Sequence, residues 1–239
     1  MNGLVTAFRT LSILPIPGKD AKDFSTALPW FPIVGASLGG LLAILALALS
    51  SLPTDVAAGF LLLAGVLLTR GFHIDGLADC ADGFGGGYTR ERVLEIMKDS
   101  ATGVFGTLAI VLSLFLKWLA LKHLLMVGNL VVIVLAYTLS RALIVEQTVC
   151  WPYARKKGTA SSFVAGATQL HRIIALLIAA AAAFLAAGPL GFTYLAIAWL
   201  AAYGIGLYSK RRIKGITGDV LGATSECVET LVLLLPLFI

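Results

Sequence analysis

Residues 28–49 read LPWFPIVGASLGGLLAILALAL, an apolar run that contains no charged side chain. A helix needs about 20 such residues to cross the hydrocarbon core of a bilayer. The whole chain has this character, because 59% of its 239 residues are hydrophobic and 13% are charged, whereas an ordinary soluble domain carries about 25% charge. A soluble fold could not bury this much apolar surface, so the sequence indicates an integral membrane protein.

Similar apolar runs recur as far as the C-terminus and predict an all-α, polytopic helix bundle with about seven transmembrane helices (six to seven). The predicted spans are residues 28–49, 56–72, 104–121, 124–145, 173–187, 190–208 and 220–239. The second and fifth are short, and Glu226 and Glu229 interrupt the last, so we expect these three to be tilted, broken or partly interfacial. We find no repeat or linker and expect residues 1–239 to form a single transmembrane domain.

Basic residues indicate the orientation, since Lys and Arg accumulate in cytoplasmic loops. With a cytoplasmic N-terminus and seven crossings, only Lys117 and Lys122 of the 18 basic residues face out. The net charge of +5 therefore reflects membrane topology, and its spread over all inner loops argues against nucleic-acid binding. Residues 1–14 have the apolar spacing of an interfacial helix but no cleavage-site pattern of a signal peptide. Three cysteines without paired spacing fit a reducing environment.

One long polar stretch, residues 70–102, lies between the second and third predicted spans, and we interpret it as a cytoplasmic acidic loop that carries the chemistry. Within it, Asp75, Asp79 and Asp82 follow the spacing i, i+4 and i+7, which would align their carboxylates along one face of a helix. Three such carboxylates repel one another, and a bound divalent cation relieves that repulsion. Mg²⁺ fits best, because it takes oxygen ligands and commonly bridges carboxylates to phosphates. The alternative is a solvated loop with scattered acids.

Several other polar residues are candidates for the same site. His73 could orient a carboxylate, act as a general base or pack at the membrane interface. Lys98 could hold phosphate oxygens and Asp99 could join the metal shell, unless the two form an interfacial pair.

The remaining candidates lie in or beside later spans. Arg141 lies deep in the fourth span and needs a partner, either a phosphate or an Asp, unless it is a plain interfacial Arg. Asp219 lies at the inner mouth of the last span, where it could bind the metal. Glu226 and Glu229 lie deeper and would either complete a second metal position or pair with Arg141.

Three segments together resemble the cobalamin synthase (adenosylcobinamide-GDP ribazoletransferase) family. They are HIDGLADCADG at 73–83, MKDSATGVFG at 97–106 and TGDVLGA at 217–223. Supporting matches are LSILPIPG at 11–18, WFPIVGASLGG at 30–40, Ser140 with Arg141, and PYAR at 152–155 followed by Gly158. The resemblance thus covers nearly the whole chain. Cys80 and Ile74 depart from the family pattern, but neither removes an expected ligand.

The resemblance implies a Mg²⁺-dependent transferase of the cell inner membrane, with its active site facing the cytoplasm. Such an enzyme joins adenosylcobinamide-GDP to α-ribazole, or to its 5'-phosphate, and releases GMP late in cobalamin biosynthesis. The residues it implies are His73 with Asp75, Asp79 and Asp82 in catalysis; Lys98, Arg141 and Arg155 on substrate; and Asp75, Asp79, Asp82, Asp99 and Asp219 on metal. The expected partners are these substrates and membrane lipid, with a homo-oligomer or a complex with other cobalamin-biosynthesis enzymes as open alternatives.

Two other functions compete with this reading. CDP-alcohol phosphotransferases perform parallel chemistry from an Asp-rich motif, but their DGxxAR pattern is missing, because Asp75-Gly76 is followed by Leu-Ala-Asp and the Arg that should follow the Ala is absent. A cation- or proton-coupled transporter would place acids along a path through the bilayer. Here the predicted spans put all but Asp55 toward one side, which favours an enzyme.

Overall fold

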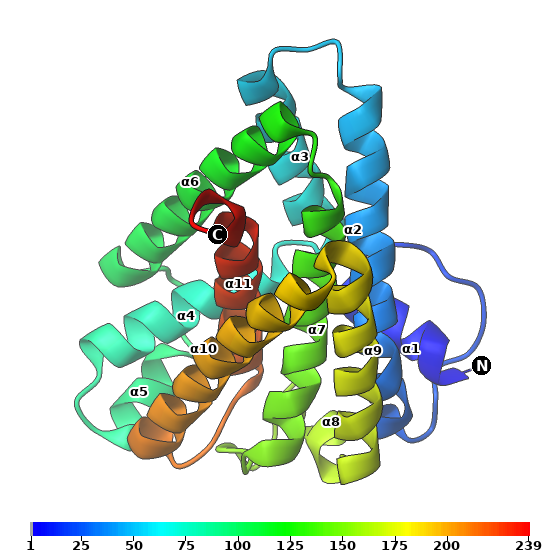
Figure 1. Cartoon of the computed structure of the whole chain (residues 1–239). Helices are drawn as coiled ribbons and strands as arrows, with labels where there is room; N and C mark the ends of the chain where they lie inside the picture. The colour runs from blue at the N-terminus through cyan, green and yellow to red at the C-terminus, as the bar shows by residue number, and fades with distance from the viewer. Residues whose placement is uncertain (1) are drawn as a thin grey trace.

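The structure is a computed structural model that describes residues 2–239, in which the regular secondary structure is helical and no β-strand is present. The helices are α1 (Asn2–Leu11), the 3₁₀ helix η1 (Phe24–Trp30), α2 (Phe31–Ala48), α3 (Thr54–Leu68), α4 (Phe72–Gly86), α5 (Arg90–Ile96), α6 (Val104–Val127), α7 (Val131–Cys150), α8 (Ser161–Ala165), α9 (Gln169–Ala187), α10 (Pro189–Ile213), α11 (Gly218–Leu234) and the 3₁₀ helix η2 (Leu235–Leu237). Figure 1 shows their arrangement.

Six of the described helices are long and apolar enough to cross a membrane. They are α2 extended by η1, α6, α7, α9, α10, and α11 extended by η2. A seventh crossing arises if α3 and α4, which meet at a bend of 87°, count as one broken span. The prediction of an all-α membrane bundle with six to seven spans is therefore confirmed, while the side on which the N-terminus lies stays a prediction.

The predicted boundary between the third and fourth long spans was wrong. Lys122 and His123 were taken as a loop, yet α6 continues to Val127 and α7 begins at Val131. The turn occurs at Gly128, which adopts a left-handed conformation with φ 70°, and the amide of Asn129 donates to the Leu124 carbonyl. This is a typical glycine-terminated helix end. Lys122 is accommodated on the helix, where its ammonium group lies 5.6 Å from the centroid of the Trp118 ring.

The polar stretch 70–102 is also more ordered than a loop. α3 ends at Leu68, and Arg70 and Gly71 both adopt left-handed backbone conformations that turn the chain into α4. α4 is continuous through Gly76, Gly83 and Gly85. Packing against α6 and α11 compensates for the low helix propensity of these glycines. The acidic residues are thus held on a helix rather than in a flexible loop.

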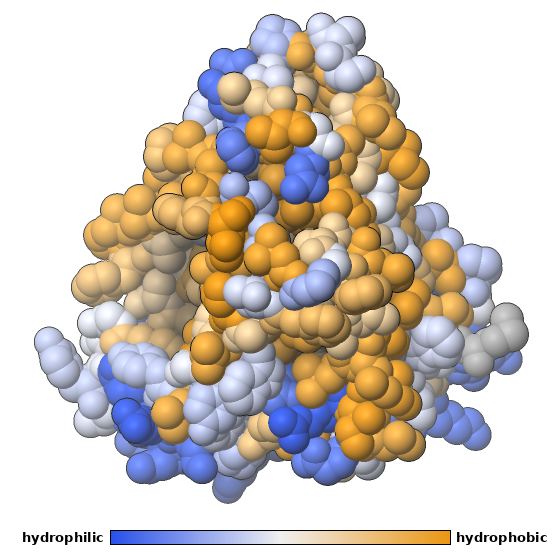
Figure 2. All heavy atoms as spheres, viewed as in Figure 1, coloured by the Kyte–Doolittle hydropathy of each residue, from blue (hydrophilic) through white to orange (hydrophobic). Residues whose placement is uncertain are grey.

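At the centre of the bundle lies α7, which packs against α2, α9 and α11. Its side chains from Val132 to Thr148 are buried except Val134, which is half-buried, so protein surrounds this helix on nearly all sides. Figure 2 shows hydrophobic residues along the sides of the molecule, hydrophilic residues gathered at its lower end and a smaller hydrophilic group near its top. In Figure 1 the α4–α5 connection, α8 and the C-terminal end of α10 lie at that lower end. An apolar band beside a polar end is the pattern of a protein embedded in a bilayer.

Candidate active site

The candidate site is built on α4, which carries Asp75, Asp79 and Asp82 as the sequence predicted. Asp75 is exposed, and Asp79 and Asp82 are half-buried. Asp75 also borders an open cleft between α1, the α3–α4 turn and α6, which Arg70 lines as well. The three carboxylates predicted at i, i+4 and i+7 therefore do lie on one helix, and they reach the protein surface.

Asp82 has a defined structural role at the start of α6. Its two carboxylate oxygens accept hydrogen bonds from the backbone amides of Gly103 (2.7 Å) and Gly106 (2.9 Å). Amides in the first turn of a helix lack partners inside the helix, and a carboxylate there also interacts favourably with the helix dipole. Asp82 thus fixes α6 against α4, although lone pairs on both of its oxygens remain for a further ligand.

Asp219 joins the site from the first turn of α11. Arg155 Nη2 lies 2.8 Å from Asp219 Oδ2, and the Thr217 hydroxyl donates to the same oxygen over 3.1 Å. A Cβ at Gly76 would lie 2.8 Å from the Asp219 carbonyl oxygen, so only glycine lets α4 approach α11 this closely. Tyr153, in the loop that carries Arg155, forms an isolated β-bridge with Ile216. This bridge holds the loop beside α11.

The four carboxylates form an unbalanced charge cluster. Asp79 experiences the negative charges of Asp219, Asp75 and Asp82, which the positive charge of Arg155 opposes. Asp82 and Asp219 have hydrogen-bond or ion-pair partners, whereas Asp75 and Asp79 have none among residues 2–239. The cluster therefore has two carboxylates available to bind a cation.

No group of three His, Cys, Asp or Glu side chains within the described chain is already arranged to hold a metal ion. The donor set itself consists of carboxylate oxygens, which suit Mg²⁺ rather than zinc. Mg²⁺ in proteins is commonly held by one or two carboxylates together with substrate phosphates and water. Asp75 and Asp79 therefore fit such an ion in their chemistry, without a complete protein cage.

Lys98 and Asp99 lie on the exposed segment between α5 and α6. Asp99 accepts a hydrogen bond from the Ala101 amide over 3.0 Å. The structure records no contact of either side chain with the carboxylates on α4. Their assignment to phosphate and metal binding stays a prediction.

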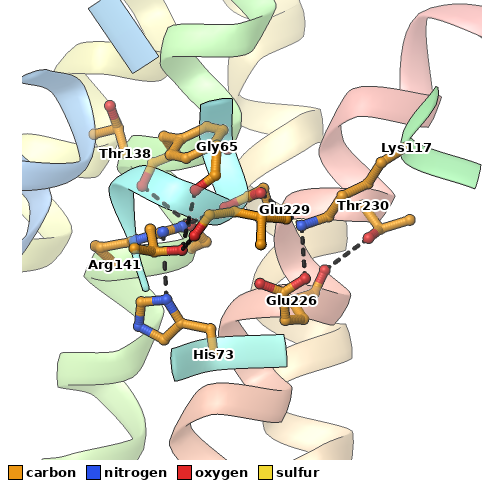
Figure 3. A network of polar contacts seen from close by, with 12 residues as sticks. Gly65, His73, Lys117, Thr138, Arg141, Glu226, Glu229 and Thr230 are labelled. Carbon is orange, nitrogen blue, oxygen red and sulfur yellow. Dashed lines mark hydrogen bonds and ion pairs between the residues drawn. The ribbon is translucent and has the colours of Figure 1, made fainter. Parts of the chain in front are cut away.

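Arg141 lies in a separate, buried ionic network (Figure 3). Its Nη1 pairs with Glu229, and Lys117 Nζ lies 2.6 Å from Glu229 and 2.7 Å from Glu226. One of the two alternatives for the deep glutamates, pairing with Arg141, is thus confirmed for Glu229, while Glu226 pairs with Lys117. The network contains two cations and two anions, so its net charge is zero.

Lys117 was predicted to face out, and this was wrong. Its side chain is buried inside the bundle between α6 and α11. A lysine in the middle of an apolar helix cannot be left unpaired in a bilayer, and two glutamates one turn apart on α11 neutralise it. Lys117 lies inside the predicted span 104–121 rather than in a loop, and this position was the signal that the count of outward-facing basic residues overlooked.

His73 lies at the edge of this network and not among the acids. Its Nδ1 is 3.5 Å from Arg141 Nη2, and the residue is 1% exposed. On α4 it lies two residues before Asp75, which turns it away from the acidic stripe. One predicted role of His73 was to orient a carboxylate on α4, and no contact between His73 and those carboxylates supports it among the described residues.

Sequence comparison places the chain in a family. The family model described as cobalamin-5-phosphate synthase matches residues 3–237. This chain belongs to the cobalamin-5-phosphate synthase family. A protein of Chlorobium chlorochromatii named adenosylcobinamide-GDP ribazoletransferase is 48% identical, and the alignment covers 97% of this chain and 94% of the relative. No solved structure matches the chain.

More distant relatives carry the same name. A protein of Chlorobium phaeovibrioides is 46% identical over 97% of this chain and 95% of its own length, and one of Syntrophobacter fumaroxidans is 38% identical over the same shares. The resemblance drawn from the three motifs is therefore confirmed. Membership in this family decides against the CDP-alcohol phosphotransferase and transporter readings.

Some residues that shape the site were not predicted. Gly103 and Gly106 bind Asp82 through their amides, and a Cβ at either glycine would lie 2.5 Å or less from the carboxylate. The MKDSATGVFG motif contains both glycines, so the motif carried the signal even though only its charged residues were interpreted. Thr217 begins the TGDVLGA motif and likewise contacts Asp219.

Proposed function

We propose that this chain transfers the adenosylcobinamide phosphate group of adenosylcobinamide-GDP to α-ribazole, or to α-ribazole 5'-phosphate, and releases GMP. The relatives' shared name, adenosylcobinamide-GDP ribazoletransferase, supports the substrates. The observation that carries the proposal is the pair Asp75 and Asp79, two carboxylates without partners beside the Arg155–Asp219 ion pair. A diphosphate substrate with its cation supplies the charges that this cluster lacks.

In the reaction, a ribose hydroxyl of α-ribazole attacks the phosphorus nearer to the cobinamide. A new P–O bond forms, the bond to the bridging diphosphate oxygen breaks, and GMP leaves with that oxygen. The hydroxyl proton passes to a carboxylate of the cluster. We assign this role to Asp75 or Asp79 rather than to His73, because His73 lies with Arg141 on the other side of α4.

Mg²⁺ bound at this site would neutralise the diphosphate and the departing phosphate. Asp75 and Asp79 would hold it, with Asp219 close by and Asp82 positioning the helix that bears them. Arg155 is placed to donate charge-assisted hydrogen bonds to phosphate oxygens. Its Nη2 already lies near the Met97 carbonyl and Asp219, so it is held at the edge of the cluster. Lys98 would bind phosphate from the exposed segment between α5 and α6.

We also propose that the site faces the cytoplasm and that the membrane is the inner one. The support is the hydrophilic end of the molecule, where the basic residues of the α7–α8 loop and the end of α10 lie. A reporter active only in the cytoplasm, fused after Lys157, should be active, whereas fusion after Ser51 should not be. The opposite pattern would reverse the orientation.

The function is tested with the purified protein in detergent, given adenosylcobinamide-GDP, α-ribazole and Mg²⁺. We expect GMP and the joined corrinoid to form in equal amounts, and chelation of the metal to stop the reaction until Mg²⁺ is restored. Asp79→Asn should lower kcat by on the order of 100-fold or more. Glu91→Gln, on an exposed residue of α5, is the matched control.

Folded wild-type protein that forms no product from either form of α-ribazole would refute the transferase assignment. Product formation that survives both chelation and Asp79→Asn would leave the transferase but refute the metal cluster.

A further inference from the structure

A pocket lies on the opposite side of α4 from the carboxylates. It is bordered by α1, α2, α4, α7, α8 and α11, and its cavity volume is about 90 Å³. This volume is smaller than the range of about 300–1,000 Å³ that pockets for whole small molecules occupy. The pocket can therefore take a ring system but not a whole nucleoside.

The pocket walls are aromatic and apolar. Phe31, Phe72 and Phe163 line it, and the rings of Phe31 and Phe163 contact each other with centroids 5.7 Å apart. Two of the three hydroxyls that line the wall are already used, because Thr10 donates to the Thr6 carbonyl and Thr148 to the Ile144 carbonyl. The third belongs to Thr159, which is exposed. Such walls select a flat, largely apolar ligand.

His73 supplies the one buried polar group of this pocket that lacks a partner. Its Nε2 is buried and makes no hydrogen bond with any described residue, a state that costs free energy unless a ligand pairs with it. Figure 3 shows the other ring nitrogen, Nδ1, directed at Arg141. Because a guanidinium only donates, Nδ1 must accept, and the proton of a neutral imidazole then resides on Nε2. His73, which lines the pocket, therefore carries an N–H donor without a partner among the described residues.

The pocket also adjoins the candidate active site. Gly218 and Thr159 line it; Gly218 immediately precedes Asp219, and Thr159 belongs to the same loop as Arg155. A ligand with its ring in the pocket could thus extend a second group toward the carboxylates around the end of α11.

We infer that this pocket binds the dimethylbenzimidazole base of α-ribazole, with His73 Nε2–H donating to the ring nitrogen that does not carry the ribose. The inference rests on the proposed function for the identity of the acceptor substrate. A benzimidazole is flat and apolar, and that nitrogen has a free lone pair, so base and pocket match in shape and in hydrogen bonding. His73 is then a substrate-binding residue and not the general base.

Equilibrium binding of α-ribazole alone to the purified protein tests this without requiring turnover. We expect His73→Leu to weaken binding about tenfold, the effect of one hydrogen bond, and His73→Gln, which keeps a donor, to recover most of it. Ala160→Phe should also weaken binding, because it fills the pocket without touching the ionic network. His123→Leu, far along α6, is the matched control and should bind like wild type.

A riboside with indole in place of the base provides the second arm, since carbon replaces the accepting nitrogen. Wild type should bind it about tenfold more weakly than α-ribazole, and His73→Leu should bind the two alike. Equal binding of both by wild type, or unchanged binding in Ala160→Phe, would overturn the assignment. Tight, His73-dependent binding in a protein that forms no product would instead count against the proposed reaction while keeping the pocket.

Discussion

Arg155 Nη2 lies 2.8 Å from Asp219 Oδ2, and this ion pair joins the loop after α7 to the first turn of α11. Both side chains are largely buried, at 13% and 18% exposed, yet they border two carboxylates that have no partner. The pair therefore both holds the site together and places a guanidinium where substrate phosphates would bind.

Arg155→Gln should lower kcat/KM for adenosylcobinamide-GDP by about 10–100-fold, because it removes a charged hydrogen-bond donor from the phosphate site. Steady-state kinetics with each substrate varied in turn would measure this. Lys157→Gln, on an exposed residue of the same loop, should change it less than about threefold. An equal loss of affinity for α-ribazole alone would show that Arg155 acts through the fold and not on the phosphates.

Asp82 offers a prediction about stability. Asp82→Ala removes both acceptors for the first-turn amides of α6, and losing such a cap costs about 0.5–2 kcal/mol. Thermal unfolding in detergent should show a lowered Tm for Asp82→Ala and a smaller decrease for Asp82→Asn, which keeps one acceptor. If Asp82→Asn were as stable as wild type but inactive, the main role of Asp82 would be to bind the metal, and its role as a helix cap would be minor.

Most of the architecture could be read from the sequence because apolar length and charge placement are strong, local signals. Membrane crossing needs only a run such as 28–49, and the Asp spacing on α4 needs only helix periodicity. The boundary errors arose where a local signal was ambiguous. Lys122 looked like a loop residue, although a long side chain on an aromatic ring satisfies it within the helix.

The partners of the buried charges could not be predicted in the same way. Arg141, Lys117 and Glu229 come from three helices separated by many residues, and which charge meets which depends on helix rotation and crossing geometry. The same holds for Asp82, whose amide partners are backbone groups and leave no trace in side-chain chemistry. Asp219 was placed near the site through its motif, while its contact with Arg155 required the structure.

The close approach of α4 and α11 depends on Gly76. In Gly76→Ala the added Cβ would lie 2.8 Å from the Asp219 carbonyl oxygen, which belongs to rigid backbone, so the helices must separate. We expect transfer activity to fall at least about tenfold, since displacements near 1 Å at a reacting centre can cost 10²-fold. Activity assays beside Gly40→Ala, where a Cβ meets nothing within 4 Å, check this. Equal activity of the two variants would contradict the tight crossing.

Lys117 gives the last prediction, which concerns the neutral network of two cations and two anions. Lys117→Met leaves Glu226 and Glu229 buried with Arg141 as their only cation, and breaking a buried pair in this way costs about 3–5 kcal/mol. Lys117→Met should therefore lower the Tm in detergent sharply, whereas Lys122→Met, which loses only a partly exposed pair 3.9 Å from Asp55, should change it little. Adding Glu226→Gln to Lys117→Met restores charge neutrality and should recover much of the loss. If the double variant were no more stable than Lys117→Met, the lysine would contribute through packing, and the charge balance proposed for this network would be wrong.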